Sequence, residues 1–450
     1  MATATKRPRV VVVGAGFGGL SVLRNLGNKA VDVLLVDRNN YHGFWPLLYQ
    51  VATGALDSAS IAYPVRGLIR PYKNADFQLA NVTGVDYANK KVLVEEGAPI
   101  DYDYLVLAAG SAQFYFGNDV LAEKTFSMKD VDEAEQIRNH VISCFEKAQT
   151  ETDPEKRKAL MTVAIVGGGP TGVELAGAYA ELFKVDFKKD FPNLDVSEAR
   201  IIMIEAMPTI MMPFSDPKLP KGQESPFQKA VAAELRKRGV EIWLSKPVKA
   251  VEEDVVQFND GDTLAAKTVI WAAGVRGAHL ADKIDVKLQR GFRVPVNEFL
   301  QLEEHSDVFV VGDMAYLEGF KWGEMTMAYP MVAQVAIQMG KQAAENILVL
   351  ASGASGGGLT KFSYYDKGSM AIIGRNAAIV SASKPLPMKL GTSGLTKFPG
   401  WVMWLLVHVM FLAGWRNRLV SIFNWSWNWL FKDRGARVLT GQRDKKTSTI

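Results

Sequence analysis

The chain of 450 residues twice presents a run of apolar, largely β-branched residues that ends in a glycine-rich turn. The first copy reads VVVVGAGFGGL at 10–20, and the second reads VAIVGGGPTGVEL at 163–175. A short, wholly apolar run predicts a strand that is buried on both faces, and the sequence after each turn is compatible with a helix. The pattern therefore predicts two strand–turn–helix units.

Both turns have the spacing G-x-G-x-x-G. The first glycine permits a tight turn, the second lets the backbone approach a pyrophosphate, and the third lets helix and strand pack closely. One such motif is weak evidence, whereas two copies behind buried-strand patterns predict two dinucleotides and electron transfer between them. The motif glycines are Gly14, Gly16 and Gly19 in the first copy and Gly167, Gly169 and Gly172 in the second.

An acidic residue ends the next apolar strand of each unit. Asp37 lies 23 residues after Gly14, close to the roughly 20-residue spacing of a ribose-binding carboxylate. Glu205 ends IIMIE after a longer spacing, because a polar insert occupies 183–200. A carboxylate here repels a 2′-phosphate, which favours NADH over NADPH. The alternative for each acid is an ordinary charged residue at a strand end.

Further periodic segments complete a duplicated architecture. Helices are predicted at 128–150 and 328–350, and a strand that ends in Gly-Asp at 308–315. The segment TVIWAAGV at 268–275 repeats the apolar strand and small-residue turn of YDYLVLAAGS at 102–111. The fold class predicted is α/β, with two Rossmann-like dinucleotide-binding domains.

The composition argues against nucleic-acid binding, disulfide redox chemistry and a metal site. The net charge is only +4, which does not favour a nucleic-acid partner. The single cysteine, Cys144, cannot form an intrachain redox disulfide and is expected to be a buried helix residue. The five histidines do not form a metal-binding motif, so no metal is expected.

The C-terminal part is rich in tryptophan. Six of the ten tryptophans lie between 401 and 429, in the runs WVMWLLVHVMFLAGW at 401–415 and LVSIFNWSWNWLF at 419–431. Neither run has the ~20 apolar residues of a membrane span. Indole rings favour the headgroup level and flanking arginines favour anionic lipid, so two amphipathic helices lying in the bilayer surface are predicted. The alternative is a pair of docked helices at a dimer interface.

These motifs together resemble the flavoprotein reductases with two dinucleotide-binding domains. Within that group, NYHGFWPLLYQVATG at 40–54, AQVAIQMG at 333–340 and DKGSMAIIG at 366–374 are similar to type II NADH:quinone oxidoreductases. The resemblance covers roughly residues 9–435. It is specific in the central motifs and one of general character in the C-terminal region.

The resemblance implies a role for each motif. Asp37 would hold the ribose of a non-covalent FAD, Asp313 its ribityl chain, and the helix start at Ala333 would face the flavin. The residues implied for FAD are Gly14, Gly16, Gly18, Gly19, Asp37, Arg38, Ala109, Gly110, Gly312, Asp313, Ala333 and Gln334. Those implied for NADH as substrate are Gly167, Gly169, Gly172, Glu174, Glu205, Ala273 and Gly274.

The family also places reactive groups near the flavin. Glu174 would relay a proton or position the nicotinamide, the alternative being a helix-dipole residue. The family associates a quinone channel with the positions of Gln334, Gln338 and Lys367. The alternatives are that Gln338 lies on a solvated helix face and that Lys367 is an ordinary lysine in a turn. Phe44, Pro46, Leu48 and Tyr49 would line the flavin pocket or belong to the core, and His42 would be structural.

The domains follow from these assignments. Residues 1–118 and 291–350 would form the FAD domain and 119–290 the NADH domain. Residues 359–450 would form a C-terminal region with anchor helices at about 399–432. A homodimer bound to the lipid bilayer surface is expected, on the cytoplasmic face because no signal peptide is apparent.

The predicted function is a peripheral membrane enzyme that passes electrons from NADH through FAD to a membrane quinone without pumping protons. The first alternative is an NAD(P)H-dependent reductase of a soluble electron carrier, against which the tryptophan-rich region argues. The second is a redox-sensing protein that holds a long-lived flavin–NAD complex and signals through a partner.

Overall fold

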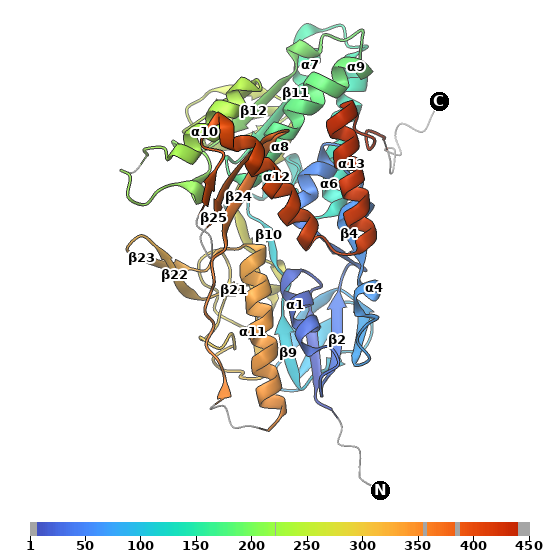
Figure 1. Cartoon of the computed structure of the whole chain (residues 1–450), viewed down its shortest axis with the longest axis vertical. Coiled ribbons are helices and arrows are strands. Elements are labelled where there is room, and N and C mark those ends of the chain that lie inside the picture. The colour runs from blue at the N-terminus through green and yellow to red at the C-terminus, as the bar shows by residue number, and fades with distance from the viewer. Residues whose placement is uncertain (1–6, 221, 354–357, 383–387, 440–450) are drawn as a thin grey trace. The chain divides into compact units, whose positions relative to one another are not determined.

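The computed structural model describes residues 7–220, 222–353, 358–382 and 388–439. Its chain divides into two units, which Figure 1 shows coloured along the sequence. The first unit contains the residues up to 43 together with 63–112 and 275–366. The second contains 44–62, 113–274 and the residues from 367 onward.

The first unit is built on a parallel sheet of five strands in the order β20-β9-β1-β2-β5. In the central strand, β1, the residues Val10 to Val13 are almost fully buried, as the apolar run predicted. The bounds are β1 Arg9–Val13, β2 Asp32–Asp37, β5 Ala75–Leu79, β9 Tyr104–Leu107 and β20 Val308–Val310. This strand order and the parallel register confirm the first Rossmann-like unit.

Two helices of this unit pack closely because small residues line their contact. Helix α1 (Phe17–Leu26) lies along α11 (Ala333–Ala351), as Figure 1 shows. A Cβ atom on Gly340 would lie 2.4 Å from the carbonyl oxygen of Gly18. The Ser21 hydroxyl donates to the carbonyl of Ile337 at 2.6 Å. The predicted helix at 328–350 therefore exists, but it begins five residues later, after the Val332 N-cap.

The second unit repeats the architecture with four parallel strands in the order β13-β12-β11-β17. Helix α8 (Pro170–Glu181) follows the central strand, and α6 (Val131–Ala148) confirms the helix predicted at 128–150. Helix α10 (Pro226–Lys237) lies between β12 and β13 along the chain. The strand bounds are β11 Thr162–Val166, β12 Arg200–Ile204, β13 Val240–Trp243 and β17 Thr268–Trp271.

The prediction of a polar insert at 183–200 is wrong for the first half of that segment, which is helical and partly buried. Helix α8 continues as a π-helical turn (Leu182–Phe187) and then as α9 (Lys188–Asp190). Phe183, Phe187 and Phe191 are buried and their rings contact Phe145. The four-residue spacing of these aromatic residues is a helical signal, which the lysines and aspartates between them obscure.

The C-terminal residues belong to the second unit, where an antiparallel sheet precedes two helices. Strand β24 packs against α8, and a Cβ atom on Gly177 would lie 2.1 Å from the carbonyl oxygen of Ile373. The predicted helices at 401–415 and 419–431 extend further toward the N-terminus, and the first continues through Pro399. The bounds are β24 Gly368–Gly374, β25 Ala377–Ala382, β26 Met388–Leu390, α12 Gly394–Phe411 and α13 Trp415–Phe431.

The units differ from the predicted domains in several places, of which three are large. The region from 367 onward is packed into the second unit and is not a separate part. Residues 44–62 also belong there, since α13 contacts this segment and the Asn417 side chain donates to the carbonyl of Ala62 at 2.9 Å. Residues 275–290 belong to the first unit. Contacts far apart along the chain set these boundaries, and no local pattern marks them.

Candidate functional site

The first glycine loop leaves open space in front of a helix. Gly14 has φ +107°, and a Cβ atom there would lie 2.3 Å from the carbonyl oxygen of Ala108. A Cβ on Gly19 would lie 1.8 Å from the oxygen of Gly14, so strand and helix meet without side chains. A Cβ on Gly16 would meet nothing within 4 Å, and Gly16 is the N-cap of α1 without a side-chain cap. The space therefore suits an anion at a helix N-terminus.

A carboxylate lies beside this loop at the end of β2. Asp37 accepts hydrogen bonds from the backbone N–H of Ala15 at 2.6 Å and of Asn39 at 2.7 Å. Burial raises the pKa of the Asp37 carboxyl above its usual range, although these bonds oppose the shift. The neighbouring Arg38 is exposed. Asp37 therefore belongs to the wall of the glycine loop.

The remaining residues predicted for FAD lie in the same unit. Asp313 accepts from the Ser111 hydroxyl at 2.9 Å. Gly312 has φ +73°, and a Cβ there would lie 3.1 Å from Cβ of Ala336 in the first turns of α11. Gly110 has open space around it, whereas a Cβ on Gly18 would contact Val311 at 3.2 Å. Gly18 is therefore a packing glycine between helix and strand.

Arg293 is a buried cation that the sequence did not single out. Its Nη1 donates to the carbonyl of Tyr329 at 3.0 Å. Its Nε and Nη2 atoms have no hydrogen-bond partner among the described residues. Burial lowers the pKa of Arg293, and the negative charge of Asp313 opposes the shift. A guanidinium with unfilled donors suits an acceptor supplied by a bound group. The sequence around Arg293 carries no signal of this role.

The second glycine loop has the same geometry. Gly167 has φ +119°, and a Cβ on Gly172 would lie 1.9 Å from the oxygen of Gly167. Gly169 has nothing within 4 Å and is the N-cap of α8. Glu205 accepts from the backbone N–H of Gly168 at 2.7 Å and of Met207 at 2.9 Å. The predicted carboxylate thus lies against the predicted loop.

The second small-residue turn is held by a glutamine that was not predicted. Gln113 donates from its side-chain amide to the carbonyl oxygens of Ala273 and Gly274, the latter at 2.7 Å. Gly274 has φ +72°, and a Cβ there would lie 2.6 Å from the carbonyl oxygen of Phe114. The backbone at the end of β17 is therefore fixed by both the glycine and the glutamine.

Glu174 lines a small pocket of the second unit. The pocket has a volume of about 70 Å³, and residues from α8, β24, α12 and α13 surround it. The backbone N–H of Ile372 lies 3.5 Å from Oε1 of Glu174. Burial raises the pKa of the Glu174 carboxyl to about 8, so the neutral acid dominates at neutral pH. Other residues around the pocket are Tyr49, Gln50, Trp401, Trp425 and Arg434.

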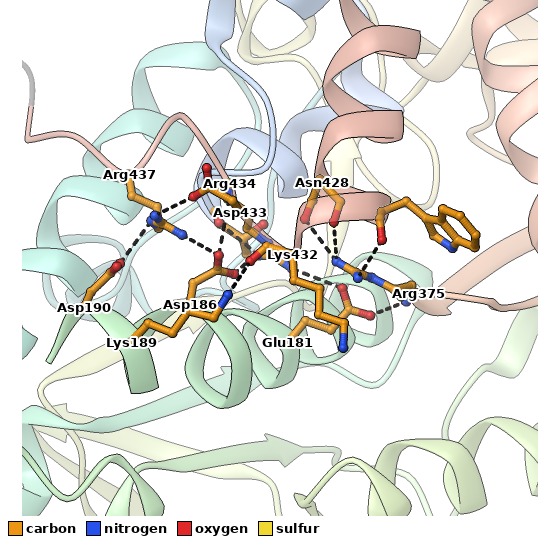
Figure 2. A network of polar contacts seen from close by, with 12 residues as sticks. Glu181, Asp186, Lys189, Asp190, Arg375, Asn428, Lys432, Asp433, Arg434 and Arg437 are labelled. Carbon is orange, nitrogen blue, oxygen red and sulfur yellow. Dashed lines mark hydrogen bonds and ion pairs between the residues drawn. The ribbon is translucent and has the colours of Figure 1, made fainter. Parts of the chain in front are cut away.

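Glu181 and Arg434 of this pocket belong to a network of charged residues, which Figure 2 shows. Arg434 is 3% exposed and contacts Glu181 at 3.2 Å and Asp186 at 3.5 Å. Arg437 also contacts Asp186, and it reaches Asp190 at 3.1 Å. The arginines that flank the two helices were predicted to favour anionic lipid. For Arg434 and Arg437 this is wrong, because they bind carboxylates of α8, the π-helical turn and α9. The network attaches the residues after α13 to α8.

Helices α12 and α13 expose a band of apolar side chains. No helix in the described part of the chain is long and apolar enough to cross a membrane. The band nevertheless contains many of the most exposed large apolar residues of the protein. They are Leu395, Phe398, Leu406, Met410, Phe411, Trp415, Leu419, Ile422, Phe423, Trp427, Leu430 and Phe431. So many exposed apolar side chains on two neighbouring helices mark an interaction surface.

The predicted quinone residues are divided between the two units. Gln338, in the first, donates to the carbonyl of Tyr365 at 3.0 Å and accepts from its N–H at 2.8 Å, which holds that segment to α11. Gln334 lies in the first turn of the same helix. Lys367, in the second unit, is exposed, with Nζ 5.9 Å from the centre of the Phe411 ring. Gln338 is therefore a half-buried side chain that is held by the backbone of Tyr365.

The aromatic segment after β3 (Tyr41–Gly43) is mostly core. His42 is buried and bonds through Nδ1 to the oxygen of Ala15 at 2.8 Å, and burial lowers its pKa to about 4, so it is neutral. Phe44 and Leu48 are buried in the second unit, whereas Pro46 is half-buried. Tyr49 is the member of this set that lines the pocket.

These features agree with comparisons to known proteins. Residues 8–340 match the model of the pyridine nucleotide-disulphide oxidoreductase family. A type II NADH:quinone oxidoreductase of Mycobacterium tuberculosis is 38% identical over 449 residues, which is 97% of this chain and 91% of the relative. The chain therefore belongs to the type II NADH:quinone oxidoreductases within that family.

Two further relatives extend the comparison. An internal alternative NAD(P)H-ubiquinone oxidoreductase of Arabidopsis thaliana mitochondria is 29% identical, over 95% of this chain and 85% of the relative. The structure of NDH2 from Plasmodium falciparum in complex with NADH has a TM-score of 0.84 at 19% identity and covers 97% of this chain and all of its own. The latter confirms the predicted fold.

Proposed function

We propose that this protein oxidises NADH and passes the electrons through FAD to a membrane quinone without pumping protons. The observation that carries the proposal is the duplicated loop, since each copy leaves open space at a helix N-terminus beside a carboxylate. The relatives that are named for NADH and quinone support the substrates.

The first unit is proposed to hold FAD. The open space over Gly16 supports a pyrophosphate there, and Asp37, beside the loop, would bind a ribose. The unfilled donors of Arg293 would meet a further acceptor of the cofactor. When bound, FAD accepts a hydride from NADH and passes two electrons to the quinone. The residues proposed to hold it are those listed from the sequence, except that Gly18 acts by packing.

The second unit is proposed to hold NADH through the loop of Gly167, Gly169 and Gly172. Glu205 would bind the adenosine ribose, and its charge disfavours the 2′-phosphate of NADPH. Ala273 and Gly274 would lie along the nicotinamide. Glu174, kept neutral by burial, would supply a proton or a hydrogen bond.

The apolar band on α12 and α13 is proposed to seat the enzyme on the cytoplasmic face of the cell membrane. Apolar and aromatic side chains would enter the headgroup region, where a lipid-soluble quinone is available. Gln334, Gln338 and Lys367 remain proposed quinone-site residues. A homodimer is also proposed, and the molar mass in detergent or lipid tests it.

Anaerobic stopped-flow absorbance tests the function. Rapid bleaching of the flavin by NADH, slower bleaching by NADPH, and rapid reoxidation by a short-chain benzoquinone are expected. Slow reoxidation by quinone would overturn the proposal and favour a soluble carrier or a sensor. Sedimentation with vesicles that contain anionic lipid tests the seating, and protein that stays in the supernatant would contradict it.

A further inference from the structure

A chain of hydrogen bonds leads from α13 to the pocket of the second unit. The indole Nε1 of Trp425 lies 2.7 Å from Oε1 of Gln50. The Nε2 atom of Gln50 lies 2.8 Å from the hydroxyl oxygen of Tyr49. Gln50 and Tyr49 are 6% and 5% exposed, so water does not compete for these bonds. All three residues line the pocket together with Glu174.

The chemistry of the three groups fixes the direction of the chain. An indole N–H can only donate, so the amide oxygen of Gln50 must face Trp425. The amide NH₂ of Gln50 must then face Tyr49, and it too can only donate. The hydroxyl oxygen of Tyr49 is therefore an acceptor in this bond, and its own hydrogen is not used by Gln50.

The hydrogen of the Tyr49 hydroxyl has no acceptor among the described residues. A buried O–H without a protein acceptor needs one from the space beside it, either a water or a bound ligand. Tyr179, a buried tyrosine of the same unit, shows the ordinary arrangement, since its hydroxyl donates to the carbonyl oxygen of Ala52 at 3.1 Å. Tyr49 differs because its hydroxyl lies at a pocket.

We propose that Tyr49 is a catalytic residue that donates a hydrogen bond to a carbonyl oxygen of the quinone, and that Gln50 and Trp425 position its hydroxyl. The assignment rests on the proposed function. The hydrogen bond from the hydroxyl stabilises the negative charge that develops on the carbonyl oxygen of the quinone during reduction, which increases the electron affinity of the quinone. Tyr49 keeps its proton throughout, so the two protons of the quinol come from elsewhere.

Two properties of the site support this role. Burial and the nearby Glu174 carboxyl raise the pKa of Tyr49 far above its usual value, so the hydroxyl remains a donor. The volume of about 70 Å³ is several times the ~10–15 Å³ that one water requires. It is thus suited to the oxygen-bearing edge of a ring rather than to a whole quinone.

The test compares the two halves of the reaction in Tyr49→Phe, which keeps the ring and removes the hydroxyl. Stopped-flow absorbance measures flavin reduction by NADH and then reoxidation by a short-chain benzoquinone or by ferricyanide, which accepts electrons without a carbonyl. The expected result is roughly a five- to tenfold slower reoxidation by the quinone, about the effect of one lost hydrogen bond. Reduction by NADH and reoxidation by ferricyanide should be unchanged.

Tyr179→Phe is the matched control, since it removes a buried hydroxyl that does not line the pocket, and it should reoxidise like the wild type. Trp425→Phe should slow the quinone step by a smaller factor. In the double variant with Tyr49→Phe it should add nothing, because Trp425 acts through Tyr49.

Equal quinone rates in Tyr49→Phe and the wild type would overturn the assignment, as would equal losses toward quinone and ferricyanide. Additive losses in the double variant would overturn the positioning role of Trp425. A wild type that quinone does not reoxidise would instead overturn the proposed function itself.

Discussion

The two glycine units share a backbone and differ in what they do with the helix that follows. Ser21 in α1 and Glu174 in α8 occupy the same place, two residues after the third motif glycine. The Ser21 hydroxyl donates to the backbone of α11, whereas the Glu174 carboxyl lines a pocket. One position of a repeated motif thus serves packing in one unit and chemistry in the other.

The far ends of the two helices differ as well. Helix α1 stops at Leu26, and Gly27 caps it with a backbone bond to Leu23 at 2.8 Å. Helix α8 continues into a π-helical turn and α9, and one carboxylate from each (Glu181, Asp186 and Asp190) binds the residues after α13. The glycine motif fixes the start of a helix, and tertiary partners determine how far it extends.

The largest effect should come from filling the open space of either loop. Gly16→Val should abolish FAD retention, whereas Gly169→Val should keep FAD and weaken NADH reduction by more than about 100-fold, because each side chain takes the place of a pyrophosphate. Flavin content and stopped-flow reduction measure the two outcomes. If both variants lost the same cofactor, the assignment of the loops would be wrong.

The next largest effect should come from the ion network around α8, which has no counterpart described for α1. Arg434→Ala leaves the buried Asp186 and the partly buried Glu181 short of a partner and should lower the free energy of unfolding by about 3–5 kcal/mol. Arg200→Ala is the control, since its bond with Glu241 is half-exposed and should be worth about 0–1 kcal/mol. Denaturant unfolding measures both, and equal losses would show that the network does not hold the unit.

Substitutions of Ser21 and Glu174 test whether the same motif position serves packing in α1 and chemistry in α8. Glu174→Gln should slow quinone reduction by roughly 10- to 100-fold with FAD retained, the range of a general acid. Ser21→Ala should leave the rate unchanged and reduce stability by about 1 kcal/mol. Single-turnover reoxidation and thermal unfolding separate the two, and a Glu174→Gln rate like that of the wild type would end the chemical role.

Glu174 also predicts a pH dependence. Its pKa is raised from 4.5 to about 8, so the folded protein holds a proton that the unfolded chain releases between these values. The free energy of unfolding should therefore fall as pH rises from about 4.5 to about 8 and change little above that. The quinone rate should fall as the acid ionises around pH 8. Glu174→Gln should show neither fall. A wild-type rate that is flat across pH 7–9 would contradict an acid role.

The smallest effect should fall on the two ribose carboxylates. Glu205→Gln should raise the rate with NADPH relative to NADH by a few-fold to about tenfold, since it removes repulsion without adding a cation. Asp37→Asn should leave the nicotinamide preference unchanged and weaken FAD retention. The ratio of kcat/KM for the two nucleotides checks the first, and an unchanged ratio would remove Glu205 from the ribose site.

Sequence alone predicts the features that are local. The glycine loops, the acids Asp37 and Glu205, and helix α6 lie where short-range patterns place them, because backbone geometry and burial act over a few residues. The pocket brings together residues from 49 to 434, and its charge network is invisible along the chain. Gln113, Arg293 and Gln50 carry no local signal, since their roles depend on which backbone or side chain meets them.

The π-helical turn after α8 can be understood as a one-residue insertion. An α-helix advances 100° per residue, so deleting the exposed Lys184 would restore α-helical winding and rotate every later residue of the segment by that angle. Asp186 and Phe187 could then no longer both face their present partners. Whether a homologue has a residue at position 184 therefore matters more for this network than which residue it has there. A homologue that lacks the insertion must attach the residues after its last helix through other side chains.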